Sequence, residues 1–460
     1  MSGNDLPRYQ HMRVIWKFFR SIWDHFMFFQ IRLSSHPRAL ILIWAGAIAL
    51  SSVLTQSRGP SALGLFASLG IGLIALPTLQ FLKNQMQAGT AGRVDFQVPP
   101  GLLDEVETAQ QAVTDKPDGM VMVPRGPNPG PIMHSVAFDK GLRKPGQDWT
   151  IQTTDDSPTY ARVIDHLRNR APQWRSYGQT KFLDQLFTKQ PLINENKIIF
   201  ETPLDLAAKE ITLGKSDYFV GMCTADLCLR TGFSIGGEHD AVLPARDRWG
   251  YQRLSDRLIA PALVNATTPA SLHLGVDVVV VTRDNRMPLA VQGKHNLQSP
   301  NRIVPFATGS MDWEDIGDNT TLKSVVLSAA RRELNEEWGG PDHNAAASRA
   351  CKSAPLQVIG MYREMLRGGK PQFVVAGRVD IDFAHMVPDA AEVVRSRHPE
   401  AVPIVESLQD VQSVASQLAN GGFEDLLGPS QALFGTFHCL KMAVEHDPKI
   451  MSDLLGLPEA

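Results

Sequence analysis

Apolar and polar positions change their spacing along this chain, and the spacing predicts its elements. From Ser324 to Gly340 apolar residues recur at helical intervals, with Leu334 and Trp338 four positions apart, so this stretch predicts a helix that Gly339 and Gly340 end in a left-handed C-cap. Around that helix lie runs rich in β-branched residues, which predict strands at 276–282, 288–291, 356–361 and 372–379. Turn residues at 283–286 and 367–370 join them in pairs.

The same reading extends to the flanking regions. Helical spacing predicts helices at 101–113, 160–168, 179–188 and 421–446, and short apolar runs predict strands at 198–200 and 218–221. Leu433, Phe437, Leu440 and Val444 form the apolar side of the closing helix.

The first hundred residues have a different composition. Basic and aromatic residues in 1–36 predict an amphipathic cytoplasmic segment on an anionic membrane surface, or else a helix packed on the protein itself. Two uncharged apolar stretches, Ala39–Leu54 and Ala62–Leu82, predict a two-span transmembrane hairpin at 39–83, with a buried hairpin of a globular core as the alternative. Lys and Arg are concentrated before the first span, which predicts cytoplasmic N and C termini.

The remainder is expected to form a tether and a globular part. Pro and Gly are frequent in 84–150, which predicts a semi-extended linker, and 151–460 is expected to fold as one domain with a core at about 270–385. The Gly-rich run 236–240 concentrates a His and two carboxylates; it predicts a polar turn or a ligand loop.

Composition narrows the function. The chain has 460 residues and a net charge of −3, so it has no basic excess for duplex nucleic acid. Four scattered cysteines do not form a disulfide framework. Cys223 and Cys228 are interpreted as buried structural thiols; the alternative is that they bind a metal ion.

The helix around residue 332 carries the candidate chemistry. Glu333, Glu336 and Glu337 stand at i, i+3 and i+4, which places three carboxylates on one helical face. A divalent cation, Mg²⁺ or Mn²⁺, would offset their repulsion, whereas without one they form a solvated acidic face. Arg332 is expected to bind phosphate or to support the fold.

The run Arg332–Gly339 resembles the second half of the Nudix hydrolase signature, Arg-Glu-apolar-x-Glu-Glu-x-Gly. The Glu of the first half would fall at Ser324, so that half is out of register. The turn Gly309–Asp315 lies about nine residues too early and is interpreted as the family's glycine turn followed by an insertion. The resemblance implies an α/β/α sandwich over about 270–385, with Glu333, Glu336 and Glu337 as metal ligands and with Arg332 and Gly309 at the phosphate ligand.

The combination of spans, linker and Nudix-like domain resembles the transmembrane-Nudix effectors of bacterial anti-phage systems. That resemblance implies a sensor that binds a cyclic oligonucleotide, assembles as a homo-oligomer and disrupts the inner membrane. Gly64, Ser68 and Gly72 form a small-residue stripe that suits such assembly, although chance gives the same spacing. The alternative is a membrane-anchored, Mg²⁺-dependent Nudix hydrolase of a nucleoside diphosphate derivative.

Overall fold

The chain divides into two compact units in the computed structural model. Unit 1 comprises 1–96, 173–194 and 232–242, and unit 2 comprises 97–172, 195–231 and 243–460. The described residues are 20, 24, 93–98, 101–111, 119–124, 130–170, 193–235, 241–243, 252–254, 257–259, 270–293, 302–339, 345–389, 393–395, 402–420 and 430–459.

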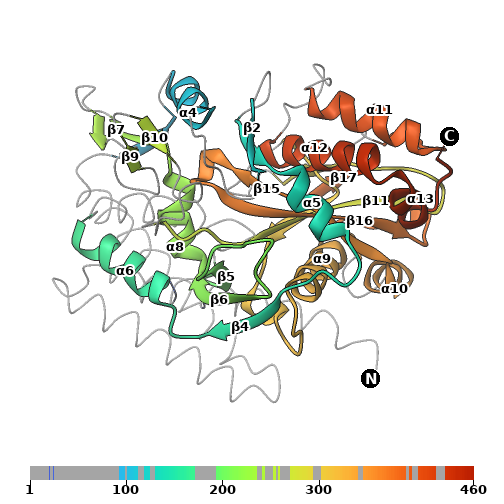
Figure 1. Ribbon diagram of the computed structural model, residues 1–460, viewed down its shortest axis with the longest axis horizontal. Helices are drawn as coiled ribbons and strands as arrows, with labels where there is room; N and C mark the ends of the chain where they lie inside the picture. Colours follow the sequence, from blue (N-terminus) through green and yellow to red (C-terminus); the bar gives the residue numbers. More distant parts are fainter. Residues whose placement is uncertain are drawn as a thin grey trace, which may run out of the picture. The chain divides into compact units, whose positions relative to one another are not determined.

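Unit 2 is built around a six-stranded mixed sheet (Figure 1). Its two long central strands, β11 and β16, run parallel, with Gly275 opposite Gln372 and Thr282 opposite Val379. The other neighbours in the sheet pair antiparallel. In order across the sheet the strands are β14 (Ala307–Ser310), β11 (Gly275–Thr282), β16 (Lys370–Val379), β15 (Leu356–Glu364), β3 (Ile132–His134) and β2 (Val121–Val123).

Helices cover both faces of this sheet (Figure 1). Val279, Val281 and Val374 point toward the C-terminal helices and share one core with them, whereas the alternate residues of β11 are buried toward α9. β11 is buried along its whole length, as a strand covered on both faces must be. The helices on one face are α9 (Leu322–Trp338) and α10 (Ala345–Ser353); on the other are α11 (Leu408–Ala419), α12 (Gln431–His446) and α13 (Pro448–Leu455).

Smaller sheets and helices complete the described chain. A three-stranded sheet in unit 2 has β4 parallel to β6 and β5 antiparallel to it. The remaining strands are β4 (Thr150–Thr154), β5 (Asn196–Phe200), β6 (Glu210–Asp217), β9 (Gln252–Leu254), β10 (Arg257–Ile259), β12 (Ala290–Gln292), β13 (Ile303–Val304), β17 (Val393–Arg395), β1 (Arg93–Gln97), β7 (Thr231–Ile235) and β8 (Ala241–Leu243). The remaining helices are α4 (Leu102–Gln111), α5 (Val136–Arg143), α6 (Pro158–Arg170), α8 (Tyr218–Cys223) and the 3-10 turns η3 (Ala225–Leu227), η6 (Trp313–Asp315), η7 (Met365–Arg367) and η8 (Phe383–His385).

The central helix α9 begins two residues before the predicted start and ends close to the predicted end. Thr321 and Ser324 form a reciprocal capping box at its N-terminus. Gly339 closes the helix with φ −72°, so the left-handed C-cap predicted there is wrong at this residue. Its close contact with Asn335 gives a different reason for glycine, because an added Cβ would lie 2.5 Å from the Asn335 carbonyl oxygen.

Two local predictions were wrong because tertiary contacts override propensity. Residues 218–221 were expected to be a strand, but Asp217 accepts a hydrogen bond from the backbone N–H of Val220 and starts helix α8. The strand predicted at 288–291 appears as β12, yet it joins β13 and β17 rather than pairing with β11.

The linker expected at 84–150 contains ordered structure in its described second half. The side chains of β3 are fully buried in the main sheet, and α5 packs on β15. Pro and Gly content was a poor guide here because the apolar residues Ile132 and Met133 have a sheet to join.

The predicted transmembrane hairpin at 39–83 requires correction. In the described ranges every helix falls short of a bilayer crossing in length or in hydropathy. The longest of them, α9, has 17 residues and carries six charged side chains, whereas a span needs about 20 mostly apolar residues. Residues 39–83 themselves lie outside the described ranges. The described residues are thus mixed α/β, and they give no support to a transmembrane hairpin or to a multi-pass inner-membrane protein.

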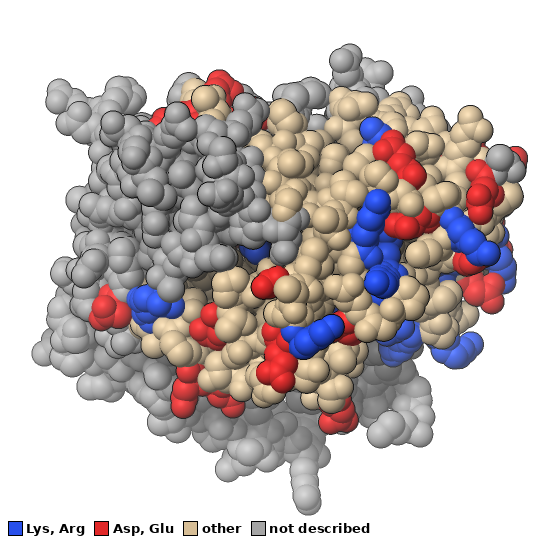
Figure 2. All heavy atoms as spheres, in the orientation of Figure 1, with Lys and Arg blue, Asp and Glu red and all other residues tan. Residues whose placement is uncertain are grey.

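Charged side chains of both signs are interspersed on the face of the described surface shown in Figure 2. This arrangement matches the near balance of 45 Lys and Arg against 48 Asp and Glu. The electrostatic field on this face therefore comes from local clusters of charged side chains, such as the arginine and glutamates of α9.

Candidate functional site

Helix α9 places two of its three signature glutamates against strand β14. Glu333 and Glu337, one helical turn apart, are 9% and 3% exposed. Glu336 lies farther round the helix, and its side chain is 55% exposed. The predicted single acidic face is therefore divided into two buried carboxylates and one that solvent reaches.

Gly309 on β14 allows the close approach of Glu333. An added Cβ at this position would lie 2.0 Å from the nearer Glu333 carboxylate oxygen and 2.2 Å from its carboxyl carbon. The neighbouring Thr308 N–H donates to Glu337 Oε1 at 3.4 Å. The structure thus brings predicted residue Gly309 together with Glu333, and the reason is steric, since only glycine leaves room for the carboxylate.

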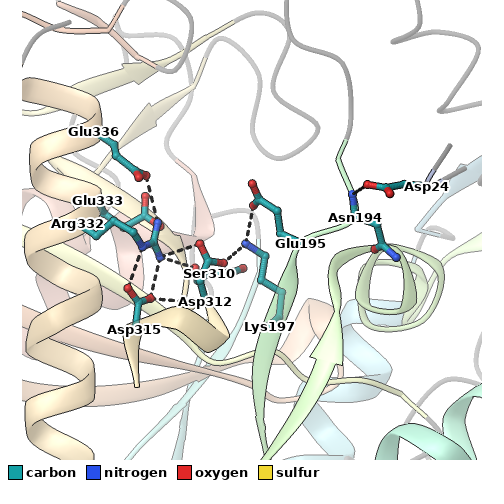
Figure 3. Close-up of polar contacts among 10 residues, drawn as sticks. All are labelled: Asp24, Asn194, Glu195, Lys197, Ser310, Asp312, Asp315, Arg332, Glu333 and Glu336. Carbon is teal, nitrogen blue, oxygen red and sulfur yellow. Dashed lines mark hydrogen bonds and ion pairs between the residues drawn. The ribbon is translucent and has the colours of Figure 1, made fainter. Parts of the chain in front are cut away.

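Arg332 is the centre of the charge cluster (Figure 3). Its Nη1 group lies 2.9 Å from Glu333 Oε1 and 3.1 Å from Glu336 Oε2. Its Nη2 group donates to the Ser310 carbonyl oxygen at 3.1 Å and lies 3.3 Å from Asp312 Oδ2. The guanidinium therefore joins α9 to the end of β14.

Asp315 on η6 makes the most regular contact with that guanidinium. Arg332 Nε donates to Asp315 Oδ1 and Nη2 to Asp315 Oδ2, both at 2.9 Å, which is a bidentate pair. Asp315 follows Gly309 at the spacing that the Nudix signature gives its Gly and first Glu. The extra residues between Asp315 and Arg332 form the 316–321 loop and the first turns of α9. The first half of the motif, out of register in sequence, is thus close to Arg332 in space.

A second cation, Lys197 on β5, reaches the cluster from a distant part of the chain. Its ammonium group contacts Asp312, and lies 3.1 Å from Glu195 Oε2 (Figure 3). Sequence analysis missed Lys197, Glu195 and Asp312 as site residues. Nothing in the local pattern of 195–197 signals the contact, because 115 positions separate Lys197 from Asp312.

Burial governs the ionisation of this cluster. Burial and, to a smaller extent, the charge of Glu336 raise the pKa of Glu333 to about 7, against the opposing effect of Arg332. Burial alone would lower the pKa of Lys197, but Asp312 and Glu195 outweigh it and the pKa is raised. For Arg332 the neighbouring carboxylates likewise outweigh burial, and the pKa is raised. Both cations therefore stay charged.

The donor set suits a hard divalent cation. Among the described residues, five carboxylates are in direct contact with Lys197 or Arg332, so carboxylates outnumber these two cations: Glu195, Asp312, Asp315, Glu333 and Glu336. Oxygen donors alone select Mg²⁺ or Mn²⁺, which use one or two carboxylates and complete their shell with water and phosphate oxygens. Among the described residues, however, the three glutamates do not converge as a three-ligand cluster; that arrangement occurs only at His134, Asp139 and Cys439.

Comparisons with known proteins add little. No family model matches the chain, and no curated protein matches it. Among solved structures, the crystal structure of DR0079 from Deinococcus radiodurans aligns with 36% of this chain and 81% of its own, at 10% identity. The TM-score of 0.24 is too low for that likeness to support an argument about fold or function. The family to which the chain belongs is therefore not shown by any comparison.

Proposed function

We propose that the α9–β14 site binds Mg²⁺ or Mn²⁺ together with a phosphorylated nucleotide, and that it hydrolyses a nucleoside diphosphate derivative. The observation that carries this proposal is the bidentate Asp315–Arg332 pair beside two buried glutamates, Glu333 and Glu337. The first-half glutamate of the signature is missing from its register in the sequence, which by itself favours binding without catalysis. The contact of Asp315 with Arg332 supports catalysis, because it supplies an acidic side chain at this place.

The chemistry that suits these groups is phosphoanhydride cleavage. A bound divalent cation neutralises phosphate oxygens and lowers the pKa of a bound water. Glu333 and Glu337 are the ligands that β14 holds in place, and Glu336 is free to turn toward solvent and ligand.

A second candidate is a sensor that binds a cyclic oligonucleotide without cleaving it. The observation that favours it is the same Arg332, whose guanidinium already engages Glu333 and Glu336. A metal must compete with that cation, and binding places lower demands on geometry than turnover does. Action on a membrane through the 39–83 hairpin forms no part of this proposal.

The test is turnover by the full chain. Purified protein is incubated with Mg²⁺ or Mn²⁺ and a set of nucleoside diphosphates linked to sugars, nucleosides or alcohols, and phosphate-containing products are separated by chromatography. Glu333→Gln and Glu337→Gln remove the proposed ligands. Glu314→Gln is the matched control, because Glu314 is an exposed carboxylate on η6.

Hydrolysis at about 1 per second or faster, lost in both ligand variants and retained in the control, supports the enzyme. Absence of turnover, with cyclic oligonucleotide binding detected by calorimetry, supports the sensor. If neither turnover nor nucleotide binding is detected, both candidate functions are overturned.

A further inference from the structure

We propose a second metal site, for one Zn²⁺, formed by His134, Asp139 and Cys439 on the opposite face of the main sheet from α9. Each offers one ligand atom, and the three atoms lie within 4.8 Å of one another. All three residues are at most 1% exposed. The site shares no residue with the α9 cluster, and the inference does not depend on the proposed function.

The three ligands come from three elements that meet in unit 2. His134 ends β3, Asp139 lies in the first turn of α5, and Cys439 lies in the middle of α12. β3 pairs with β15, while α5 and α12 both pack on it. A metal here would link β3 and α5 to helix α12.

The Asp139 carboxylate is fixed by its surroundings. Its Oδ1 accepts the backbone N–H of Met361 at 2.9 Å, and its Oδ2 lies 2.7 Å from His134 Nε2. Gly360, at a bulge in β15, leaves room for it, since an added Cβ would lie 2.5 Å from Oδ2. The position of this carboxylate is therefore set by sterics as well as by hydrogen bonds.

His438 supplies the outer partner that metal-binding histidines usually have. Its Nε2 lies 3.3 Å from His134 Nδ1, and the two rings meet edge to face with centroids 4.7 Å apart. If His134 Nε2 binds the metal, its Nδ1 must carry the proton, and His438 is positioned to accept it.

Ligand softness and charge select zinc over magnesium. A thiolate and an imidazole suit Zn²⁺, whereas Mg²⁺ takes oxygen ligands. One Zn²⁺ with one carboxylate, one thiolate and one neutral imidazole has no net charge, which suits a site without solvent. Zinc would displace the thiol proton of Cys439 to solvent as the Zn–S bond forms. Tetrahedral bonds require the three ligands to shift from their present positions and leave a fourth position open.

The experiment measures zinc in the full chain. Protein is stripped with chelator, reloaded with Zn²⁺, desalted and analysed by mass spectrometry of the metal. We expect about one zinc per chain in the parent and in Cys351→Ser, which removes another buried thiol, and little in Cys439→Ser. Zinc retained by Glu333→Gln separates this site from the α9 cluster. Equal zinc in the two cysteine variants, or none in the parent, overturns the proposal.

Two further readouts remain if Cys439→Ser fails to fold. Co²⁺ loaded into the parent chain should give the thiolate-to-cobalt charge-transfer absorption in the near ultraviolet, and its absence counts against the site. His438→Gln should weaken zinc affinity about 10- to 100-fold, while the exposed His446→Gln on the same helix leaves it unchanged. A purely structural histidine at 438 would not shift the zinc affinity.

Discussion

Asp315 and Arg332, 17 positions apart, form a bidentate ion pair with two contacts of 2.9 Å. The Asp315 side chain is 4% exposed and that of Arg332 is 23% exposed, so the pair is partly shielded from water. It connects the turn after β14 to the acidic end of α9. The pair therefore fixes where the signature glutamates lie relative to the glycine turn.

Loss of this pair should destabilise unit 2. Asp315→Asn keeps the volume but removes the charge opposite Arg332, and we expect a loss of about 1–3 kcal/mol in the free energy of unfolding, measured by urea denaturation. Three other carboxylates remain in contact with Arg332, so the loss should stay below that of an isolated buried pair. The control Glu314→Gln should change stability by less than about 0.5 kcal/mol. Equal effects of the two variants would show that the pair contributes nothing.

Gly309→Ala tests the contact between β14 and Glu333. The added methyl group would overlap the Glu333 carboxylate, and overpacking of this kind costs about 1–3 kcal/mol. The double variant Gly309→Ala, Glu333→Ala removes the overlap. Its loss in unfolding free energy should therefore be smaller than the sum of the two single losses. Strict additivity in the double-mutant cycle would show that the two groups do not meet.

Divalent cations should raise the melting temperature of the parent chain. A cation that binds only the folded state stabilises it by RT ln(1 + [L]/Kd), where [L] is the free cation concentration. Glu333→Gln and Glu337→Gln should abolish the shift caused by Mg²⁺ or Mn²⁺. Glu336→Gln should only reduce it, because that side chain is half exposed and turns away from β14. The same loss in all three variants would contradict the division into two buried ligands and one outer carboxylate.

Asp277 should make stability depend on pH. It is fully buried on β11, where Thr308, Tyr362 and Thr436 donate hydrogen bonds to its carboxyl oxygens. Burial outweighs these donors, and with the nearby Glu364 it raises the pKa of Asp277 from 3.8 to about 6.

The raised pKa means that the folded state holds the proton more tightly than the unfolded state does. The stabilisation is present below the unfolded pKa and is lost as pH rises from about 4 through 6. Asp277→Asn removes this titration. The unfolding free energy of the parent minus that of the variant should therefore fall by roughly 2–3 kcal/mol from pH 4 to pH 7.5. Urea denaturation of both proteins at each pH measures it. A constant difference would show that Asp277 has an ordinary pKa.

Local patterns in the sequence determined several elements correctly. A run rich in β-branched residues predicted β11, and the strands flanking 367–370 form the β15–β16 hairpin, where Gly368 and Gly369 have φ of +69° and +86°. Helical spacing predicted α6, α9 and the buried side of α12, because periodicity depends only on near neighbours. The same spacing brought Glu333 and Glu337 to one side of α9.

Long-range contacts decided the rest. The parallel pairing of β11 with β16 and the entry of β3 into the sheet depend on partners far along the chain. Lys197 meets Asp312, and Asp139 and Cys439 meet His134, across separations that sequence spacing does not encode. Motif and periodicity therefore identified the acidic helix. The tertiary fold decided which carboxylates are buried, which cations face them and where the second cluster forms. These features depend on packing between elements, which local sequence patterns do not determine.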